Sequence, residues 1–173
     1  MAMAKLLERA RAVRLAILDV DGVLTDGTLW YGPEGEALKA FNTLDGHGVK
    51  MLAEAGIAVA ILSGRASGAV ERRAKELGIA HVIQGAADKV REFERLVAKL
   101  GVQPADCAFV GDDLPDLAVM QRCGLAVAVA NAVDEVKAIA HYVTRARGGQ
   151  GAVREFCDLV AAAKQGDRKD PGR

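Results

Sequence analysis

Hydrophobic positions along the chain follow two alternating patterns. Short, continuous apolar runs are typical of strands that are buried on both faces of a sheet. They predict strands at residues 14–19, 57–62, 81–83, 107–110, 125–129 and 142–143. Between them, apolar residues recur every three or four positions, as in amphipathic helices. This spacing predicts helices at residues 3–13, 45–55, 67–77, 87–100, 114–122, from 133 onwards, and 152–164. Alternating strands and helices predict an α/β, Rossmann-like fold with three layers, in which a parallel sheet with right-handed crossovers carries helices on both faces.

Residues 26–42 interrupt this alternation. Two short strand-like runs flank the turn Gly32-Pro33-Glu34-Gly35, which predicts a small β-hairpin insert. Since no repeat and no second apolar core follow, we expect one domain over residues 1–164. Residues 165–173 are polar and contain glycine and proline, which predicts a flexible tail.

Composition narrows the classes of function. The 173 residues are 51% hydrophobic, which suits a single domain with a sizeable core. A formal net charge of zero provides no electrostatic basis for binding nucleic acid or a membrane surface, so we expect neither partner. No segment approaches the ~20 apolar residues of a membrane span, and charged residues interrupt the N-terminal segment where a signal peptide would be apolar. The expected compartment is the cytoplasm, where Cys107, Cys123 and Cys157 are expected to be reduced structural thiols.

The first strand ends in two carboxylates, Asp19 and Asp21. Side chains two residues apart on a strand point the same way, so both carboxylates are expected to reach one point in space. Two carboxylates this close repel each other unless a cation lies between them. Oxygen ligands of this kind suit Mg²⁺, which keeps water or substrate phosphate in its remaining coordination positions.

Polar residues also follow the later strands. Ser63-Gly64-Arg65 follows the second strand, Asp88-Lys89 follows the third at the start of a helix, and residues 111–116 follow the fourth. Because ligands of open parallel sheets bind outside the carboxyl ends of the strands, these residues are expected to converge. Asp113 or Asp116 is expected to hold metal-bound water or to orient the ligands.

Acids, a hydroxyl and a lysine around Mg²⁺ suit phosphoryl transfer. In this interpretation Asp19 is the nucleophile, and Asp21 protonates the leaving alkoxide and later deprotonates the attacking water. Ser63 binds a phosphate oxygen, and Lys89 offsets the negative charge. Asp112 joins Asp19 and Asp21 as a metal ligand.

Three other interpretations compete with an enzyme. A calcium-binding loop is disfavoured because Val23 and Leu24 occupy positions where that loop needs its ligands and turn. Receiver domains, which are phospho-aspartate switches, also place acids, a hydroxyl and a lysine around Mg²⁺. They lack a second acid two residues after the nucleophile, which here is Asp21. A non-catalytic phosphatase-like module is disfavoured because every catalytic residue type is present.

Four segments, residues 19–27, 63–65, 89 and 111–116, together resemble the motifs of the haloacid dehalogenase-like (HAD) phosphohydrolase superfamily. The resemblance covers residues 14 to about 164. The hairpin, residues 41–50 and residues 142–155 resemble one family within it, the 3-deoxy-D-manno-octulosonate 8-phosphate (KDO 8-phosphate) phosphatases of lipopolysaccharide precursor synthesis. The resemblance implies a hairpin in place of a cap domain, a small-molecule sugar-acid phosphate as substrate, and a homotetramer with shared active sites.

The same resemblance implies a set of substrate-binding residues. They are Asp21, Asn42, Thr43, Leu44, Asp45, Gly46, Lys50, Arg65, Arg73 and Lys89. Leu44 stands where many relatives have arginine, and Lys50 stands at a position that is arginine in others. A nine-carbon ulosonate 9-phosphate is the alternative substrate that the sequence leaves open. The sequence also leaves open whether the Gly148–Gly151 segment contributes to a neighbouring site.

Overall fold

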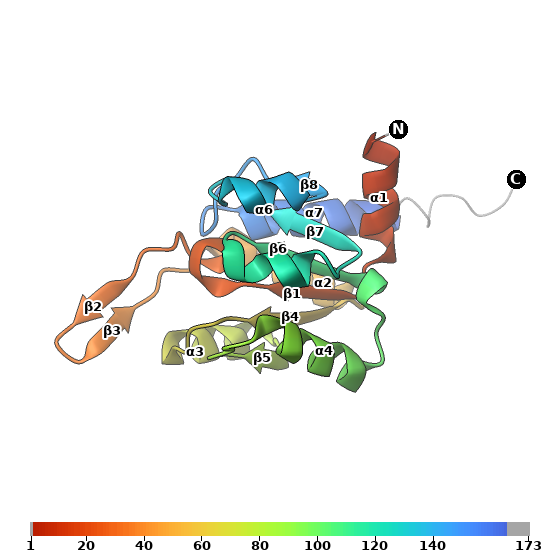
Figure 1. Cartoon of the computed structure of the whole chain (residues 1–173). Coiled ribbons are helices and arrows are strands. Elements are labelled where there is room, and N and C mark those ends of the chain that lie inside the picture. Colours follow the sequence, from red (N-terminus) through yellow and green to blue (C-terminus); the bar gives the residue numbers. More distant parts are fainter. Residues whose placement is uncertain (1, 166–173) are drawn as a thin grey trace, which may run out of the picture.

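The structure is a computed structural model, and it describes residues 2–165 of the 173 (Figure 1). Within this range the main feature is a single sheet of six parallel strands in the order β5-β4-β1-β6-β7-β8. The strands are β1 (Leu15–Leu18), β4 (Ala58–Leu62), β5 (His81–Ile83), β6 (Cys107–Gly111), β7 (Leu125–Ala128) and β8 (Tyr142–Val143). This sheet confirms the predicted fold class. Residues 166–173, most of the predicted flexible tail, lie outside the described residues.

Helices cover both faces of this sheet (Figure 1). One face carries α2 (Thr43–Glu54), α3 (Gly68–Leu77) and α7 (Ala152–Gln165). Helix α1 (Ala2–Ala12) stands at the end of the sheet opposite the hairpin and packs against α7, which also packs against α2. The other face carries α4 (Lys89–Leu100), α5 (Leu117–Met120) and α6 (Asp134–Ile139). Short 3₁₀ turns at Pro104–Asp106 and Leu114–Asp116 precede β6 and α5. No helix in residues 2–165 has the length and apolar character that crossing a bilayer requires.

The central strands are apolar along their whole length because both of their faces are covered. All four residues of β1, all five of β6 and all four of β7 are buried. The three cysteines are buried and unpaired, as expected for structural thiols.

The predicted hairpin is present as β2 (Trp30–Gly32) and β3 (Gly35–Leu38), which pair antiparallel. It extends away from the sheet (Figure 1). Its apolar side chains Trp30, Tyr31 and Leu38 are exposed by 56%, 64% and 67%. Within residues 2–165, therefore, most of this apolar surface is not covered by other parts of the chain.

Two local details differ from the expectation. The first strand ends at Leu18, and the chain then makes a tight turn over Val20–Leu24, in which Gly22 has a φ of +87°. Helix α2 begins at Thr43 and not at Asp45, because the side chain of Asn42 accepts hydrogen bonds from the amides of Leu44 and Asp45 and so caps the helix earlier.

Candidate active site

A cavity of about 190 Å³ opens at the carboxyl edge of the sheet. It lies where the strand order reverses, since the chain leaves β1 for β4 on one side and later returns to β6 on the other. The predicted residues that line it are Asp19, Asp21, Ser63, Arg65, Lys89, Asp112, Asp113 and Asp116. The structure therefore brings the four predicted motifs together at one point.

Lys89 links two acids on the floor of this cavity. Its Nζ lies 3.0 Å from Oδ1 of Asp19 and donates a 2.8 Å hydrogen bond to Oδ1 of Asp116. All three side chains are buried. Burial alone would lower the pKa of Lys89, but the two carboxylates outweigh it and raise the pKa above its usual value. The lysine therefore stays charged.

Asp19 carries an elevated pKa of about 6, because burial disfavours its charged form and the charge of Asp116 adds to this effect. Lys89 opposes the shift only in part. The amide N–H of Asp19 donates to the carbonyl of Val110, which ties the residue to β6. Asp19 is thus held next to β6 with its carboxylate in the cavity.

Three carboxylates, from Asp19, Asp112 and Asp116, lie with one oxygen each within 4.8 Å of one another. Oδ1 of Asp112 is buried and has no hydrogen-bond partner in the described residues. Burial and then repulsion by Asp19 raise the pKa of Asp112 to about 8. An unpartnered, buried carboxylate oxygen among other acids is a good ligand for a hard divalent cation, so these residues fit Mg²⁺.

Besides binding Lys89, the carboxylate of Asp116 binds backbone amides of the loop after β6. Its Oδ2 accepts hydrogen bonds from the amides of Asp112 (3.0 Å) and Asp113 (3.4 Å), while Asp113 caps the following 3₁₀ turn. This reciprocal capping box fixes the loop after β6. Asp116 therefore holds the backbone of Asp112 in place. That Asp113 or Asp116 orients the metal ligands stays a prediction.

The side chain of Asp21 points away from the other acids. The early end of β1 and the turn at Gly22 direct it toward the hairpin, where it contacts Nζ of Lys39 and lies 3.6 Å from Nε of Arg65. The simple period of a strand, which placed both carboxylates at one point, does not apply to this turn. Asp21 still lines the cavity, but its carboxylate is outside the cluster of three acids.

Ser63 lies directly after β4 and is buried. Its amide donates to the carbonyl of Ile83 (2.9 Å), and its Oγ accepts a 3.3 Å hydrogen bond from the amide of Arg65. The residue is therefore fixed by a neighbouring strand and by its own loop at the wall of the cavity that it lines.

The structure does not bring the remaining predicted substrate residues to this cavity. Thr43, Leu44 and Lys50 are exposed on α2. Arg73 lines a separate groove of about 510 Å³ between the end of the hairpin and α3. The carbonyl of Asn42 accepts a 3.4 Å hydrogen bond from Nη2 of Arg73.

Asp45 and Gly46 have structural partners. The carboxylate of Asp45 accepts hydrogen bonds from the amides of Arg154 (2.8 Å) and Gly151 (3.4 Å), at the start of α7. Burial raises its pKa, and these amides oppose the shift. At Gly46, a side chain would overlap the guanidinium of Arg73. In this chain both residues therefore join α2 to its neighbours.

Two residues near the cavity were not predicted. Lys39, at the end of the hairpin, contacts Asp21. The amide side chain of Asn131 donates a 3.0 Å hydrogen bond to the carbonyl of Gly22 and accepts a 2.6 Å bond from the amide of Gly148. Asn131 comes shortly after β7, at the same sheet edge as the other polar residues, and this position was the signal that could have revealed it.

The glycine-rich segment before α7 packs against the turn of its own chain. The amide of Gly149 donates to the carbonyl of Val23 (2.9 Å). A side chain on Gly148 would overlap the carbonyl of Gly22. The segment therefore needs glycine for a close approach of two backbones.

Comparison with known proteins agrees with this geometry. Residues 78–156 match the family model of the haloacid dehalogenase-like hydrolases. The chain is 49% identical over 158 residues to the 3-deoxy-D-manno-octulosonate 8-phosphate phosphatase of Yersinia pestis, a match that covers 91% of this chain and 84% of that protein.

Solved structures give the same result. The corresponding phosphatase of Moraxella catarrhalis, in complex with a magnesium ion, a phosphate ion and KDO, has 44% identity and a TM-score of 0.92, covering 94% of each chain. A cobalt-bound form from Haemophilus influenzae has 41% identity and a TM-score of 0.89, covering 91% of this chain and 92% of that one. Fold and site thus define a HAD-like hydrolase. Within that class, the chain belongs to the family of 3-deoxy-D-manno-octulosonate 8-phosphate phosphatases.

Proposed function

We propose that this protein is a Mg²⁺-dependent phosphoric monoester hydrolase that converts KDO 8-phosphate to KDO and phosphate through an aspartyl-phosphate intermediate. The observation that carries the proposal is the cavity in which Asp19, Lys89 and Asp112 meet, where Oδ1 of Asp112 has no hydrogen-bond partner among residues 2–165. The names of the relatives supply the substrate. The receiver-like switch is disfavoured, because Asp21 lines the same cavity as a second acid.

In the proposed reaction a carboxylate oxygen of Asp19 attacks phosphorus as the bond to the sugar oxygen breaks. Asp21 gives its proton to that leaving oxygen and later takes one from the water that hydrolyses the aspartyl phosphate. The second step releases phosphate and restores the carboxylate of Asp19. Ser63 Oγ donates to a phosphoryl oxygen, and Lys89 offsets the charge gathered on Asp19 and the phosphoryl group.

Mg²⁺ would be held by the carboxylates of Asp19 and Asp112, with Asp21 as the third residue assigned to it. When bound, the ion neutralises charge on the phosphoryl oxygens. Asp116 belongs to the same acidic cluster, but it already binds Lys89 and two amides. We therefore assign it to orienting Asp112.

For the sugar acid we propose contacts from Arg65, which lines the cavity, and, in a homotetramer whose neighbouring subunits complete each site, from Asn42, Thr43, Leu44, Lys50 and Arg73. These five lie outside the cavity of their own chain and are exposed or half-buried, so a neighbouring subunit can reach them. Asp45 and Gly46 are buried, and we propose that they serve substrate binding by holding α2 in place. The exposed apolar side chains of the hairpin, Trp30, Tyr31 and Leu38, are the proposed contact surface.

Two further assignments belong to this proposal. Residues 1–164 act as one phosphatase domain, which the single sheet and its continuous core support. The compartment is the cytoplasm, which the three unpaired cysteines support.

Phosphate release across a panel of sugar phosphates, with and without Mg²⁺, tests the function. KDO 8-phosphate is expected to give the highest kcat/KM, and chelation of Mg²⁺ should abolish release. Higher kcat/KM for a nine-carbon ulosonate 9-phosphate would favour the alternative substrate. Asp19→Asn should lower kcat by at least about 10³-fold, and release at an undiminished rate would remove the covalent mechanism.

A further inference from the structure

Both carboxylate oxygens of Asp21 are engaged by cations from two different elements. Nζ of Lys39, one residue beyond the end of β3, contacts Oδ1. Nε of Arg65, in the loop after β4, lies 3.6 Å from Oδ2. The hairpin of the same chain therefore reaches an acid of the cavity directly.

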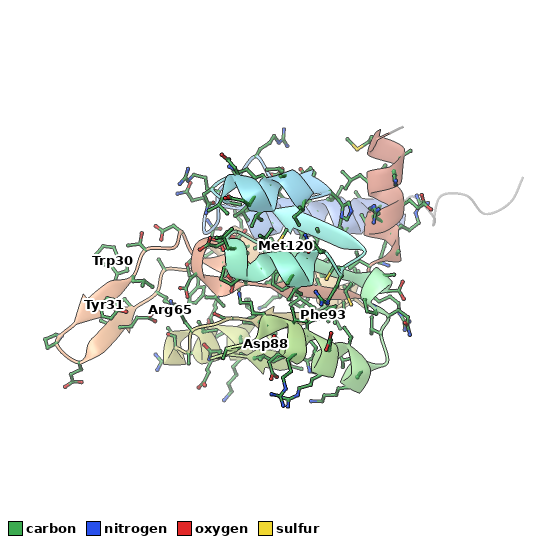
Figure 2. All side chains as sticks on the ribbon, viewed as in Figure 1. Trp30, Tyr31, Arg65, Asp88, Phe93 and Met120 are labelled. Carbon is green, nitrogen blue, oxygen red and sulfur yellow. The ribbon has the colours of Figure 1, made fainter. Side chains whose placement is uncertain are left out.

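Glu36 connects the two cations to each other. Its Oε2 lies 3.2 Å from Nζ of Lys39 and 3.0 Å from Nη2 of Arg65. Nη2 of Arg65 also donates a 3.1 Å hydrogen bond to the hydroxyl of Tyr31. Figure 2 shows Arg65 at the base of the hairpin that carries Tyr31. Strands β2 and β3 thus both take part in the network around Asp21.

The two cations differ in their exposure to water. The side chain of Lys39 is 1% exposed, whereas that of Arg65 is 44% exposed. Ion pairs that are shielded from water are screened less by salt and hold a fixed geometry better than exposed ones. Lys39 is consequently the stronger constraint on the orientation of Asp21.

We propose that Lys39 is a positioning residue of the active site, which from the hairpin holds the carboxylate of Asp21 in place for proton transfer to the leaving oxygen. The inference rests on the proposed function, in which Asp21 is the acid and base. Nζ of Lys39 contacts Oδ1 of Asp21 while Nε of Arg65 lies 3.6 Å from Oδ2, so the two cations fix the direction in which this carboxylate faces. Glu36 fixes the ammonium group of Lys39, so the hairpin takes part in positioning the acid.

The test uses the dependence of the rate on the leaving group. A sugar alkoxide needs a proton as it departs, whereas p-nitrophenolate leaves without one. Misplacing an acid costs up to about 10²-fold in rate. Lys39→Ala is therefore expected to lower kcat/KM by about 10- to 100-fold for the sugar phosphate that the wild type cleaves fastest, and by less than about 3-fold for p-nitrophenyl phosphate.

Two further variants separate positioning from folding. Lys39→Arg keeps a cation and should recover most of the lost kcat/KM on the sugar phosphate. Glu34→Ala changes an exposed residue of the hairpin turn and should match the wild type on both substrates. Thermal unfolding of each variant, measured in parallel, identifies one that has lost its fold.

An equal loss on both substrates, or no loss on either, in a folded Lys39→Ala protein would overturn the inference. A wild type that cleaves another sugar phosphate faster than KDO 8-phosphate would refute the proposed substrate. It would leave the comparison of leaving groups, and hence the test of Lys39, in force.

Discussion

Gly22 lies directly against the side chain of Asp112, since a β-carbon on Gly22 would stand 2.6 Å from Cγ of that residue. Gly22 also has a φ of +87°, which L-residues with side chains rarely adopt. The turn after β1 can therefore approach the loop after β6 only because Gly22 has no side chain. Oδ1 of Asp112 is buried and has no hydrogen-bond partner within residues 2–165.

Gly22→Ala is therefore expected to displace Asp112 and weaken Mg²⁺ binding. Gly27→Ala is a matched control, because Gly27 has the same φ of +87° while its nearest neighbour would lie at 3.5 Å. Backbone strain of about 1–2 kcal/mol should lower the free energy of unfolding of both variants, measured by urea denaturation. Only Gly22→Ala should raise the Mg²⁺ concentration that half-activates phosphate release. Equal half-activating concentrations in the two variants would contradict the fit described here.

Lys89 is the next site to probe, because it is the buried cation among three acids. Lys89→Met keeps the length of the side chain and removes the charge, so kcat is expected to fall by about 10²–10³-fold. The control is Lys99→Met, which changes an exposed lysine on the last turn of the same helix, α4. Steady-state kinetics measure the effect. A kcat for Lys89→Met within about 3-fold of the wild type would show that its charge is not needed.

Binding of Mg²⁺ should depend on pH. A cation binds the deprotonated carboxylates, and the pKa values of Asp19 and Asp112 are raised to about 6 and about 8. Affinity is therefore expected to rise as pH increases from 6 to 8, with release of protons on binding. Calorimetry in buffers of different ionisation enthalpy measures both quantities. An affinity that is constant from pH 6 to 8 would show that these carboxyls are already ionised.

The same raised pKa values predict how pH affects stability without the metal. Above the ordinary Asp pKa of 3.8, the folded form keeps a proton on Asp19 up to a pH of about 6 and on Asp112 up to about 8, whereas the unfolded chain has lost both protons. Stability then falls as pH rises through this range. The free energy of unfolding in EDTA should decrease accordingly, and added Mg²⁺ should oppose the decrease. Denaturation curves across this range that do not shift with pH would contradict the prediction.

The hairpin provides the test of assembly. Leu38→Glu places a charge on an apolar side chain that is 67% exposed, so it should dissociate the proposed tetramer without unfolding the chain. Light scattering measures the mass, and Glu34→Ala in the hairpin turn is the control. A monomeric wild type would contradict the proposal of shared active sites.

Much of the architecture was predictable from local patterns. Continuous apolar runs predicted strands at 57–62 and 107–110, which the structure places at 58–62 and 107–111, and Gly32-Pro33-Glu34-Gly35 identified the hairpin. The convergence of Asp19, Ser63, Lys89 and Asp112 followed from the rule for parallel sheets, because each residue comes at or soon after a strand end. These features depend on short-range periodicity and on chain direction, and both are visible in a sequence.

The orientation of Asp21 and the function of Asp45 were not predictable in this way. Asp21 turns toward Lys39 because the strand ends at Leu18, and Asp45 is occupied by amides of α7, more than a hundred positions along the chain. No local sequence pattern predicts a partner that is so distant along the chain.

For this protein, the amino-acid sequence by itself determined which residue types arrive at the active edge of the sheet and therefore the class of chemistry. Only the tertiary structure decided how those groups pair. Lys89 lies between Asp19 and Asp116, Lys39 contacts Asp21, and Oδ1 of Asp112 has no hydrogen-bond partner in the part of the chain that the structure describes. The physical reason is that strand periodicity sets where a side chain starts, whereas burial and the charges of neighbouring elements set where its end group comes to rest.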